Sequence, residues 1–338
     1  MNDSYELGNK LSEQELCPPE FLVEQEAAFA RDIERLHAKS SEHVRVVCPA
    51  CQGSDAKPAF EKYGFAFQNC NTCDTIYMSP RPSEAVLAEY YANSENYAYW
   101  AKHIFPASEQ SRREKIHKPW LKRILGYCDE FQISRRLLLE IGPGFGTFCS
   151  VATEAKVFNR VVGVEPTPEL AQACRDRGVE VFEQRVEDLD DSLKDADVVV
   201  AFEVIEHLFE PRTFIEGIKA KMSPGALLIL SCPNGLGFDI AMLGAKALAV
   251  DAEHVNLFNP TSLTRLLDTL GFDVVKAHTP GRLDAEFVRE AALKSEISLD
   301  PFLQRVLVDE WEELGWSFQQ FLAANGLSSH MWVVSKLR

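Results

Sequence analysis

Three residues that could carry acid–base or metal chemistry lie together in the segment AFEVIEHLFEP, residues 201–211. Glu203, Glu206 and His207 follow an apolar run that predicts a buried strand. An imidazole can accept a proton near neutral pH, and carboxylates with imidazoles can bind a divalent cation. Carboxylates in a first helical turn are also stabilised by the helix dipole without any function. A general base, a metal site and a plain helix start are therefore the three interpretations of this segment.

A second acid–imidazole pair, Glu253 and His254, occurs in the segment AEHVNLF. It could complete a site for Mg²⁺, Mn²⁺ or Zn²⁺ from the next crossover of the chain, provided that His254 lies beside His207. His207 is the first candidate for a base that accepts a proton from the acceptor. The predicted catalytic residues are His207, Glu203, Glu206 and His254.

Short apolar runs alternate with helical segments from residue 136 onward, and they are the elements that must position these side chains. Strands that are apolar on both faces and alternate with helices predict an α/β fold with a parallel sheet covered on both sides. Ligands of such folds bind at the carboxyl ends of the strands, and residues 203–207 follow the fourth strand. Helices are expected at residues 147–157, 168–177, 188–194 and 211–222.

The segment LEIGPGFGTF places glycines at the first junction between a strand and a helix. Glycines there let the backbone approach a ligand closely and expose amide groups at a helix start. Glu165 ends the second strand, where a carboxylate can accept hydrogen bonds from both ribose hydroxyls. These features predict a nucleotide-type cofactor.

The glycine turn, Glu165, VEDL after the third strand and FEVIEHL after the fourth form an ordered set. The set resembles the class I S-adenosylmethionine-dependent methyltransferases over roughly residues 136–278 and the last strand. The resemblance implies S-adenosyl-L-methionine as cofactor. It also implies a Rossmann-like sheet of seven strands in the order 3-2-1-4-5-7-6, with strand 7 antiparallel. The helical and acidic segment at 279–330 is expected to be an insertion, which departs from the minimal pattern of this family.

The resemblance further implies residue roles in cofactor binding. The glycines would line the methionine and ribose, Glu140 would lie near the amino-acid end, and Glu165 would hold the ribose. Glu187 or Asp188 would face the adenine edge, and Phe202 would flank the cofactor. The implied cofactor-binding residues are Glu140, Gly142, Gly144, Gly146, Glu165, Glu187, Asp188 and Phe202.

The EVIEH segment also resembles ubiquinone-pathway O-methyltransferases and small-RNA 2′-O-methyltransferases, in which two glutamates and a histidine hold a divalent metal. This implies a second metal at Glu203, Glu206, His207 and His254. The same segment occurs in methyltransferases of this fold without a metal, where it shapes the acceptor pocket.

Four cysteines have the spacing of a zinc ribbon. Two C-x2-C pairs, separated by eighteen residues, can each offer two thiolates to one metal ion. All four ligand positions are cysteines, so a structural rather than a catalytic zinc is expected. The predicted ligands are Cys48, Cys51, Cys70 and Cys73.

The expected organisation has four parts. Residues 1–44 would form an N-terminal helical segment that docks or dimerises, 45–82 the zinc ribbon, and 83–135 a helical cap or lid rich in tyrosine. Residues 136–338 would form the methyltransferase domain.

The net charge of −16 and the pI near 5.0 disfavour general binding of nucleic acid. No apolar stretch is long enough to span a membrane, and the N-terminus lacks a secretory pattern, so a cytoplasmic protein is expected. The ribbon ahead of this domain resembles bacterial sugar and surface-polysaccharide methyltransferases, which implies polysaccharide biosynthesis and the hydroxyl of a sugar or glycan precursor as acceptor. The alternatives are a metal-assisted RNA ribose 2′-O-methyltransferase, a C-methyltransferase of a nucleotide-linked deoxysugar, and a non-catalytic scaffold.

Overall fold

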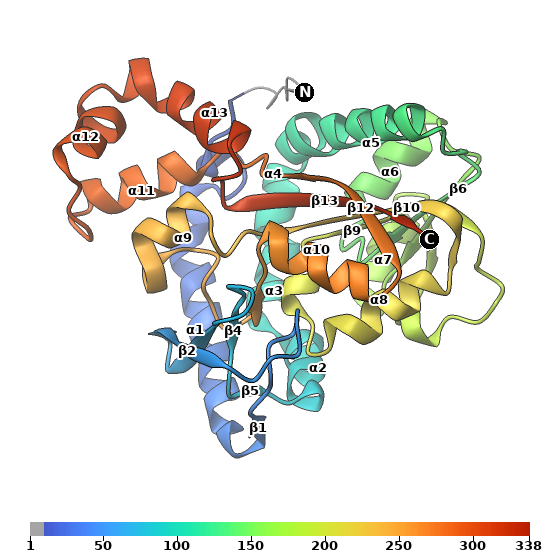
Figure 1. The fold of residues 1–338 in the computed structure, drawn as a ribbon, viewed down its shortest axis with the longest axis horizontal. Helices are drawn as coiled ribbons and strands as arrows, with labels where there is room; N and C mark the ends of the chain where they lie inside the picture. Colours follow the sequence, from blue (N-terminus) through green and yellow to red (C-terminus); the bar gives the residue numbers. More distant parts are fainter. Residues whose placement is uncertain (1–9) are drawn as a thin grey trace.

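The computed structural model describes residues 10–338, so the first nine residues of the expected N-terminal segment lie outside it. A seven-stranded sheet in the order β12-β13-β10-β9-β6-β7-β8 forms its centre (Figure 1). Strand β13 is antiparallel to both of its neighbours. The predicted strand order and the antiparallel seventh strand are confirmed. The strands are β6 (Leu137–Ile141), β7 (Arg160–Val164), β8 (Glu180–Phe182), β9 (Ala196–Phe202), β10 (Met222–Pro233), β12 (Phe272–His278) and β13 (His330–Leu337).

Helices cover both faces of this sheet, because its central strands are apolar on both sides. Every residue of β6 and β9 is buried. Leu138 of β6 packs with one group of helices and Leu139 with the other. The helices on the Leu138 face are α5 (Lys118–Phe131), α6 (Thr147–Ala155) and α7 (Pro168–Asp176). Those on the Leu139 face are α8 (Pro211–Lys219) and α10 (Pro260–Thr269).

The four-cysteine segment forms a small sheet that the second half of the chain completes. Its order is β11-β4-β3-β2, and β11 (Asn256–Leu257) pairs with β4. The ribbon therefore packs into the same body as the large sheet. Its strands are β2 (Ala56–Lys62), β3 (Phe65–Cys70) and β4 (Ile76–Met78), and a separate two-stranded pairing joins β1 (His43–Val44) to β5 (Arg81–Pro82).

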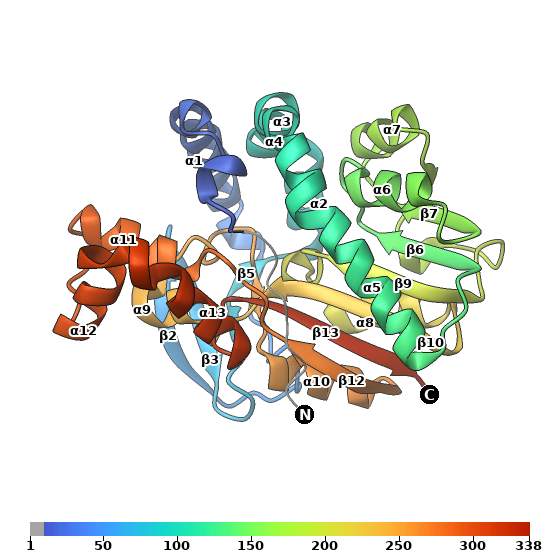
Figure 2. The same cartoon turned by 90° about the horizontal axis from the view of Figure 1, so that it is seen from above.

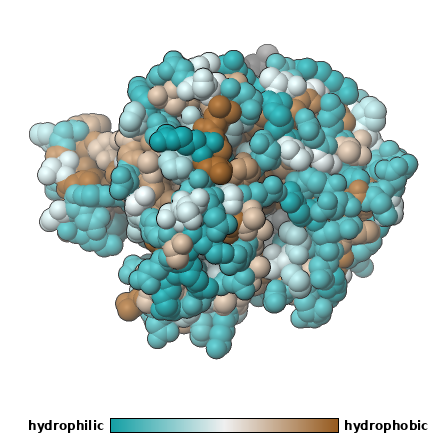
Figure 3. All heavy atoms as spheres, turned by 90° about the horizontal axis from the view of Figure 1, so that it is seen from below, coloured by the Kyte–Doolittle hydropathy of each residue, from teal (hydrophilic) through white to brown (hydrophobic). Residues whose placement is uncertain are grey.

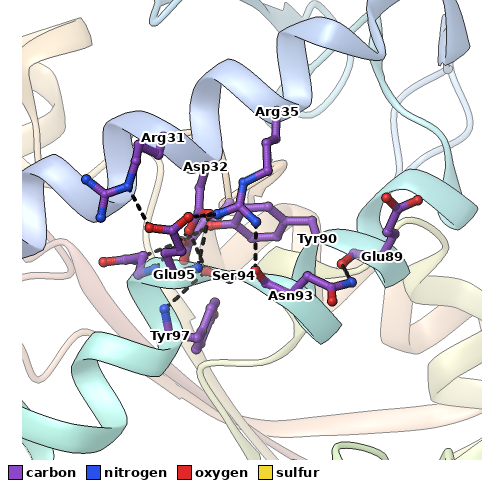
Figure 4. Close-up of polar contacts among 11 residues, drawn as sticks. Arg31, Asp32, Arg35, Glu89, Tyr90, Asn93, Ser94, Glu95 and Tyr97 are labelled. Carbon is purple, nitrogen blue, oxygen red and sulfur yellow. Dashed lines mark hydrogen bonds and ion pairs between the residues drawn. The ribbon is translucent and has the colours of Figure 1, made fainter.

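Helix α1 (Leu22–Ala38) lies beside the helices that follow the ribbon, and one buried carboxylate joins them (Figures 2 and 4). Asp32 is 1% exposed and accepts hydrogen bonds from the Ser94 hydroxyl at 2.6 Å and the Asn96 N–H at 2.9 Å. Because these groups stand at the start of α3, Asp32 caps that helix from another part of the chain. The helices after the ribbon are α2 (Glu84–Asn93), α3 (Glu95–Tyr99) and α4 (Phe105–Arg112), with π-helical turns at Trp100–Ile104 and Arg113–His117.

The 279–330 insertion is helical, as expected, and forms a lobe at one side of the molecule (Figures 1 and 2). The surface seen from below is mostly hydrophilic, with separate hydrophobic areas (Figure 3). The helices of the insertion are α11 (Asp284–Leu293), α12 (Pro301–Gln304) and α13 (Trp316–Ala324), with π-helical turns at Arg305–Asp309 and Trp311–Gly315. Helix α9 (Phe238–Leu243), which follows β10, shares a hydrophobic core with α11.

One predicted helix does not form. Residues 188–194 contain only the end of a short 3-10 turn, Val186–Asp188. The Asp190 carboxylate accepts the N–H of Ser192 at 2.8 Å, and Lys221 donates to the carbonyl of Asp190 at 3.1 Å. These side chains occupy backbone groups that a helix would use itself. Among residues 10–338, no helix combines the length and hydropathy that crossing a bilayer requires.

Candidate functional site

The glycine turn after β6 has three glycines in the left-handed region, with φ of +71° at Gly142, +54° at Gly144 and +74° at Gly146. A Cβ at Gly142 would lie 2.7 Å from a methyl group of Val204, and one at Gly146 would lie 2.8 Å from the Cys174 sulfur. A Cβ at Gly144 would meet no atom within 4 Å. Two of the glycines are therefore required for packing, and the middle one borders space that a ligand could fill.

Two buried carboxyl groups flank this turn. Glu165 accepts hydrogen bonds from the N–H groups of Gly144 at 3.2 Å and Thr167 at 3.0 Å, although burial raises its pKa. Glu140 is 4% exposed, and its Oε2 has no hydrogen-bond partner among the described residues. Burial raises the pKa of Glu140 to about 7. A cationic ligand would neutralise this carboxylate, and the ammonium group of S-adenosyl-L-methionine fits that requirement.

The other expected cofactor residues lie at the same edge of the sheet. Phe202 is the last residue of β9. The centroid of its ring lies 4.5 Å from that of Trp120 and 5.3 Å from that of Trp332. Glu187 and Asp188 lie in the turn after β8. Glu187 is 19% exposed and lies 3.5 Å from Arg185, whereas Asp188 is exposed.

The four cysteines come together around one point. Their sulfur atoms all lie within 4.8 Å of one another, and the pairs Cys48–Cys73 and Cys51–Cys70 are each 3.5 Å apart. A tetrahedral zinc with bonds of about 2.3 Å holds its sulfurs roughly 3.8 Å apart, so this arrangement fits the metal. Burial opposes ionisation of Cys70, but the backbone N–H groups of Thr72 and Cys73 hold its pKa below the ordinary value.

A second cluster contains Glu206, His207 and His254, whose ligand atoms also lie within 4.8 Å of one another. The two imidazole rings are 4.6 Å apart between centroids. Glu206 is 0% exposed, and neither of its carboxylate oxygens has a hydrogen-bond partner among residues 10–338. Burial, and then the charge of Glu203, raise the pKa of Glu206 well above its ordinary value. A buried carboxyl group with no partner is costly unless a cation or a proton neutralises it.

Both histidines are held through Nδ1. His207 Nδ1 lies 3.3 Å from the carbonyl of Glu253, and His254 Nδ1 lies 3.1 Å from the carbonyl of Ala249 and 3.0 Å from the Asp251 carboxylate. Since carbonyls and carboxylates only accept hydrogen bonds, Nδ1 is the donor in each ring, and Nε2 of the neutral His207 ring is an acceptor. Burial and the nearby His254 lower the pKa of His207 to about 3. Burial opposes protonation of His254, but Asp251 raises its pKa to about 10.

Glu203, expected in the same cluster, points elsewhere. Its carboxylate accepts hydrogen bonds from the Ser231 hydroxyl at 2.6 Å and from His330 Nε2 at 2.9 Å. Its backbone is in the left-handed region, with φ of +55°. Sequence patterns did not identify His330 or Ser231, because nothing in their local segments distinguishes them.

The loop that carries His254 is held by the helices after the ribbon. The Glu253 carboxylate accepts hydrogen bonds from the Tyr90 hydroxyl and from Asn96 Nδ2, the latter at 3.0 Å. Burial raises the pKa of Glu253 to about 7. The Tyr91 ring stands edge-on to His207 at 6.0 Å. In the segment expected as a helical cap or lid, Tyr91 therefore lies against His207, and Tyr90 holds the Glu253 side chain next to His254.

Comparison with known proteins identifies the domain. Residues 110–277 match the family described as "Methyltransferase domain". A protein of Mycolicibacterium smegmatis named "Probable S-adenosylmethionine-dependent methyltransferase" is 28% identical over 52% of this chain and 70% of its own length. A "Ubiquinone biosynthesis O-methyltransferase" of Bradyrhizobium sp. is 30% identical over 32% of this chain and 45% of its own length. A methyltransferase structure from Clostridium acetobutylicum aligns over 70% of this chain and 97% of that one, at 9% identity and a TM-score of 0.46.

The matched region includes the glycine turn, Glu165 and the segment from Glu203 to His207, and it ends before the 279–330 insertion. The strand order of the sheet is the one that this resemblance predicted. The chain is therefore a member of the S-adenosylmethionine-dependent methyltransferases, with its methyltransferase domain in residues 110–277.

Proposed function

We propose that this methyltransferase methylates a hydroxyl oxygen of a small polar acceptor, a sugar or glycan precursor, with a divalent cation bound by Glu206, His207 and His254. The observation that carries the proposal is the Glu206 carboxylate, which is fully buried without a partner between two imidazoles. The acceptor class follows from the net charge of −16, which disfavours RNA, and from the resemblance of the ribbon layout to sugar methyltransferases.

The donor set indicates the class of metal. Two imidazoles and one carboxylate suit Zn²⁺ or Mn²⁺ better than Mg²⁺, which prefers oxygen ligands. A cation bound there would neutralise Glu206 and could make an acceptor hydroxyl more acidic. A protein acceptor fixes Nδ1 of both imidazoles, as is usual for metal-bound histidines, and His254 would release its Nε2 proton when a cation binds. This arrangement supports His207 as a ligand rather than as the base.

The cofactor would occupy the edge of the sheet at the glycine turn. S-adenosyl-L-methionine supplies an activated methyl group when it is bound. Glu165 would accept hydrogen bonds from the ribose, and the unpartnered oxygen of Glu140 would face the ammonium group. The chain's own residues then have to orient the acceptor and remove its proton.

The test uses the full chain, S-adenosyl-L-methionine labelled in its methyl group, and a panel of nucleotide sugars alongside total RNA. We expect transfer to a sugar, loss of transfer after mild chelation that leaves one equivalent of zinc bound, and recovery with Mn²⁺ or Zn²⁺. Glu206→Gln should abolish the recovery, whereas the exposed Glu216→Gln should keep it.

Three outcomes would contradict the proposal. Failure to bind S-adenosyl-L-methionine or its demethylated product at millimolar concentration in calorimetry would remove the activity itself. Transfer that survives complete removal of the second metal would remove its role. Salt-dependent transfer to RNA would favour the ribose 2′-O-methyltransferase instead.

A further inference from the structure

Glu203 and His330 form a hydrogen-bonded pair at the edge of the sheet where the parallel strands end. Glu203 follows β9, and His330 is the first residue of β13, opposite Pro233 of β10. Because β13 runs antiparallel, its first residue lies where β9 and β10 end. Val204, next to Glu203, contacts the position where Gly142 would carry a side chain. The pair is therefore close to the glycine turn of the cofactor site.

The hydrogen bond between the two side chains defines the state of the imidazole. His330 Nε2 donates to the Glu203 carboxylate at 2.9 Å, so the neutral ring has an acceptor at Nδ1. Nδ1 has no hydrogen-bond partner within residues 10–338. The side chains of His330 and Glu203 are 28% and 42% exposed, so a ligand can reach them. Glu206, by contrast, is fully buried.

The backbone of Glu203 is strained in a way that aims its carboxylate. A non-glycine residue at φ +55° costs about 1 kcal/mol or more. Ser231 holds this conformation, since its carbonyl accepts the N–H of Glu203 at 3.0 Å and its hydroxyl donates to the Glu203 carboxylate at 2.6 Å. Strain of this kind persists where the surrounding structure fixes it, and it is frequent at active sites.

An aromatic ring lies alongside the imidazole. The His330 ring lies nearly parallel to Trp120, with an interplanar angle of 9° and a centroid distance of 6.2 Å. Trp120 packs on Phe202, the residue before Glu203. The titratable groups that interact electrostatically with Glu203 are Glu206, His207, Cys232 and His254. On the aromatic side, His117 contacts Trp120 and Arg123 lies over Trp332.

We propose that His330, oriented by Glu203, is the general base that accepts the proton of the acceptor hydroxyl. This inference rests on the O-methylation proposed above. Nδ1 of His330 takes the hydroxyl proton while the acceptor oxygen forms its bond to the methyl carbon. The bond from that carbon to sulfur breaks with its electron pair on sulfur, which gives S-adenosylhomocysteine and a methyl ether. Glu203 stabilises the imidazolium, which releases its proton to solvent through its exposed side.

The test compares wild type, His330→Gln, Glu203→Gln and His278→Gln, using the nucleotide sugar that the panel identifies. We expect His330→Gln to lower kcat by roughly 10²- to 10³-fold, with the KM for S-adenosyl-L-methionine and the metal content unchanged. The acid limb of its pH–kcat profile should disappear. Glu203→Gln should lower kcat by about 10-fold or more and move that limb to lower pH, because the imidazole loses its anionic partner. His278 lies on the outer strand β12, so its variant should match wild type.

Several results would overturn the proposal. In His330→Gln, these are an acid limb that remains in the pH–kcat profile, or a kcat that falls by less than threefold. In Glu203→Gln, it is a drop in the amount of metal bound per chain. If no nucleotide sugar is methylated, the proposed function fails, and the pair is judged by ¹⁵N chemical shifts of the imidazole. A proton on Nε2 of His330 in wild type, and mixed tautomers in Glu203→Gln, would support the pair. A proton on Nδ1 in wild type would reject it.

Discussion

The four-cysteine cluster and the Glu206–His207–His254 cluster are two candidate metal sites built in opposite ways. The cysteines occupy two knuckles of one short segment, whereas the second cluster joins the crossover after β9 to the loop before β11. The second cluster also depends on Tyr90 and Asn96, from the helices after the ribbon. A metal in the first should hold together a segment too small to fold alone. A metal in the second should change chemistry in a domain that already folds.

The largest expected effect is at the cysteine cluster. Cys70→Ser should remove the structural zinc and destabilise the chain by about 5 kcal/mol or more, because metal binding supplies the folding energy of such a segment. Zinc content by mass spectrometry and thermal unfolding would measure this. Cys17→Ser, which changes a cysteine outside the cluster, should keep both unchanged. Equal zinc content in wild type and Cys70→Ser would contradict the zinc ribbon.

Substitution of a metal ligand in the second cluster should raise the stability of the metal-free protein, whereas substitution in the cysteine cluster should lower stability. Glu206→Gln should lower methyl transfer by roughly 10²-fold but make the metal-free protein more stable, by about 1–3 kcal/mol, because it removes a buried carboxyl group without partners. The raised pKa of Glu206 means that its neutral form suits the fold, so stability is lost as the pH rises. The gain from glutamine should therefore be larger at pH 8 than at pH 5. A lower free energy of unfolding in metal-free Glu206→Gln at pH 8 would refute this.

Glu140 is a buried carboxyl group outside the Glu206–His207–His254 cluster, so it serves as the comparison that separates the effect of a metal from the effect of burial. Its pKa is raised from 4.5 to about 7, so between these values the folded chain keeps a proton that the unfolded chain has released. The free energy of unfolding should fall over this range, by an amount on the order of 3 kcal/mol, and level off above pH 7. Glu140→Gln should flatten the curve. Mn²⁺ or Zn²⁺ should suppress the pH dependence that Glu206 contributes and leave that of Glu140 intact.

The smallest effect concerns support of the second cluster. Tyr90→Phe removes the hydroxyl that donates to Glu253 and should cost about 1 kcal/mol in stability. The metal affinity at His254 should fall by 10-fold or more, as is typical of outer-shell partners. Isothermal titration of metal-free protein with Mn²⁺ measures the affinity. Tyr97→Phe is the matched control, and equal affinities in the two variants would show that Tyr90 has no supporting role.

The local sequence was sufficient to predict the features that depend only on residues close together along the chain. The C-x2-C pairs, the glycine turn and the alternation of strands and helices each follow from spacing and residue type. The failed helix at 188–194 shows the limit of such patterns. Lys221, which is distant in sequence, donates to backbone carbonyls there and favours an irregular turn.

Sequence by itself determined the class of sheet, its strand order through the resemblance, and the residue types available where the parallel strands end. Only the tertiary structure decided how those residues are grouped. Glu203 and Glu206 are three residues apart, yet one carboxylate points to His330 and the other to His254. The reason is the left-handed backbone at Glu203, held by Ser231 of the neighbouring strand. His330 joins the site because β13 runs antiparallel and brings its first residue to that edge.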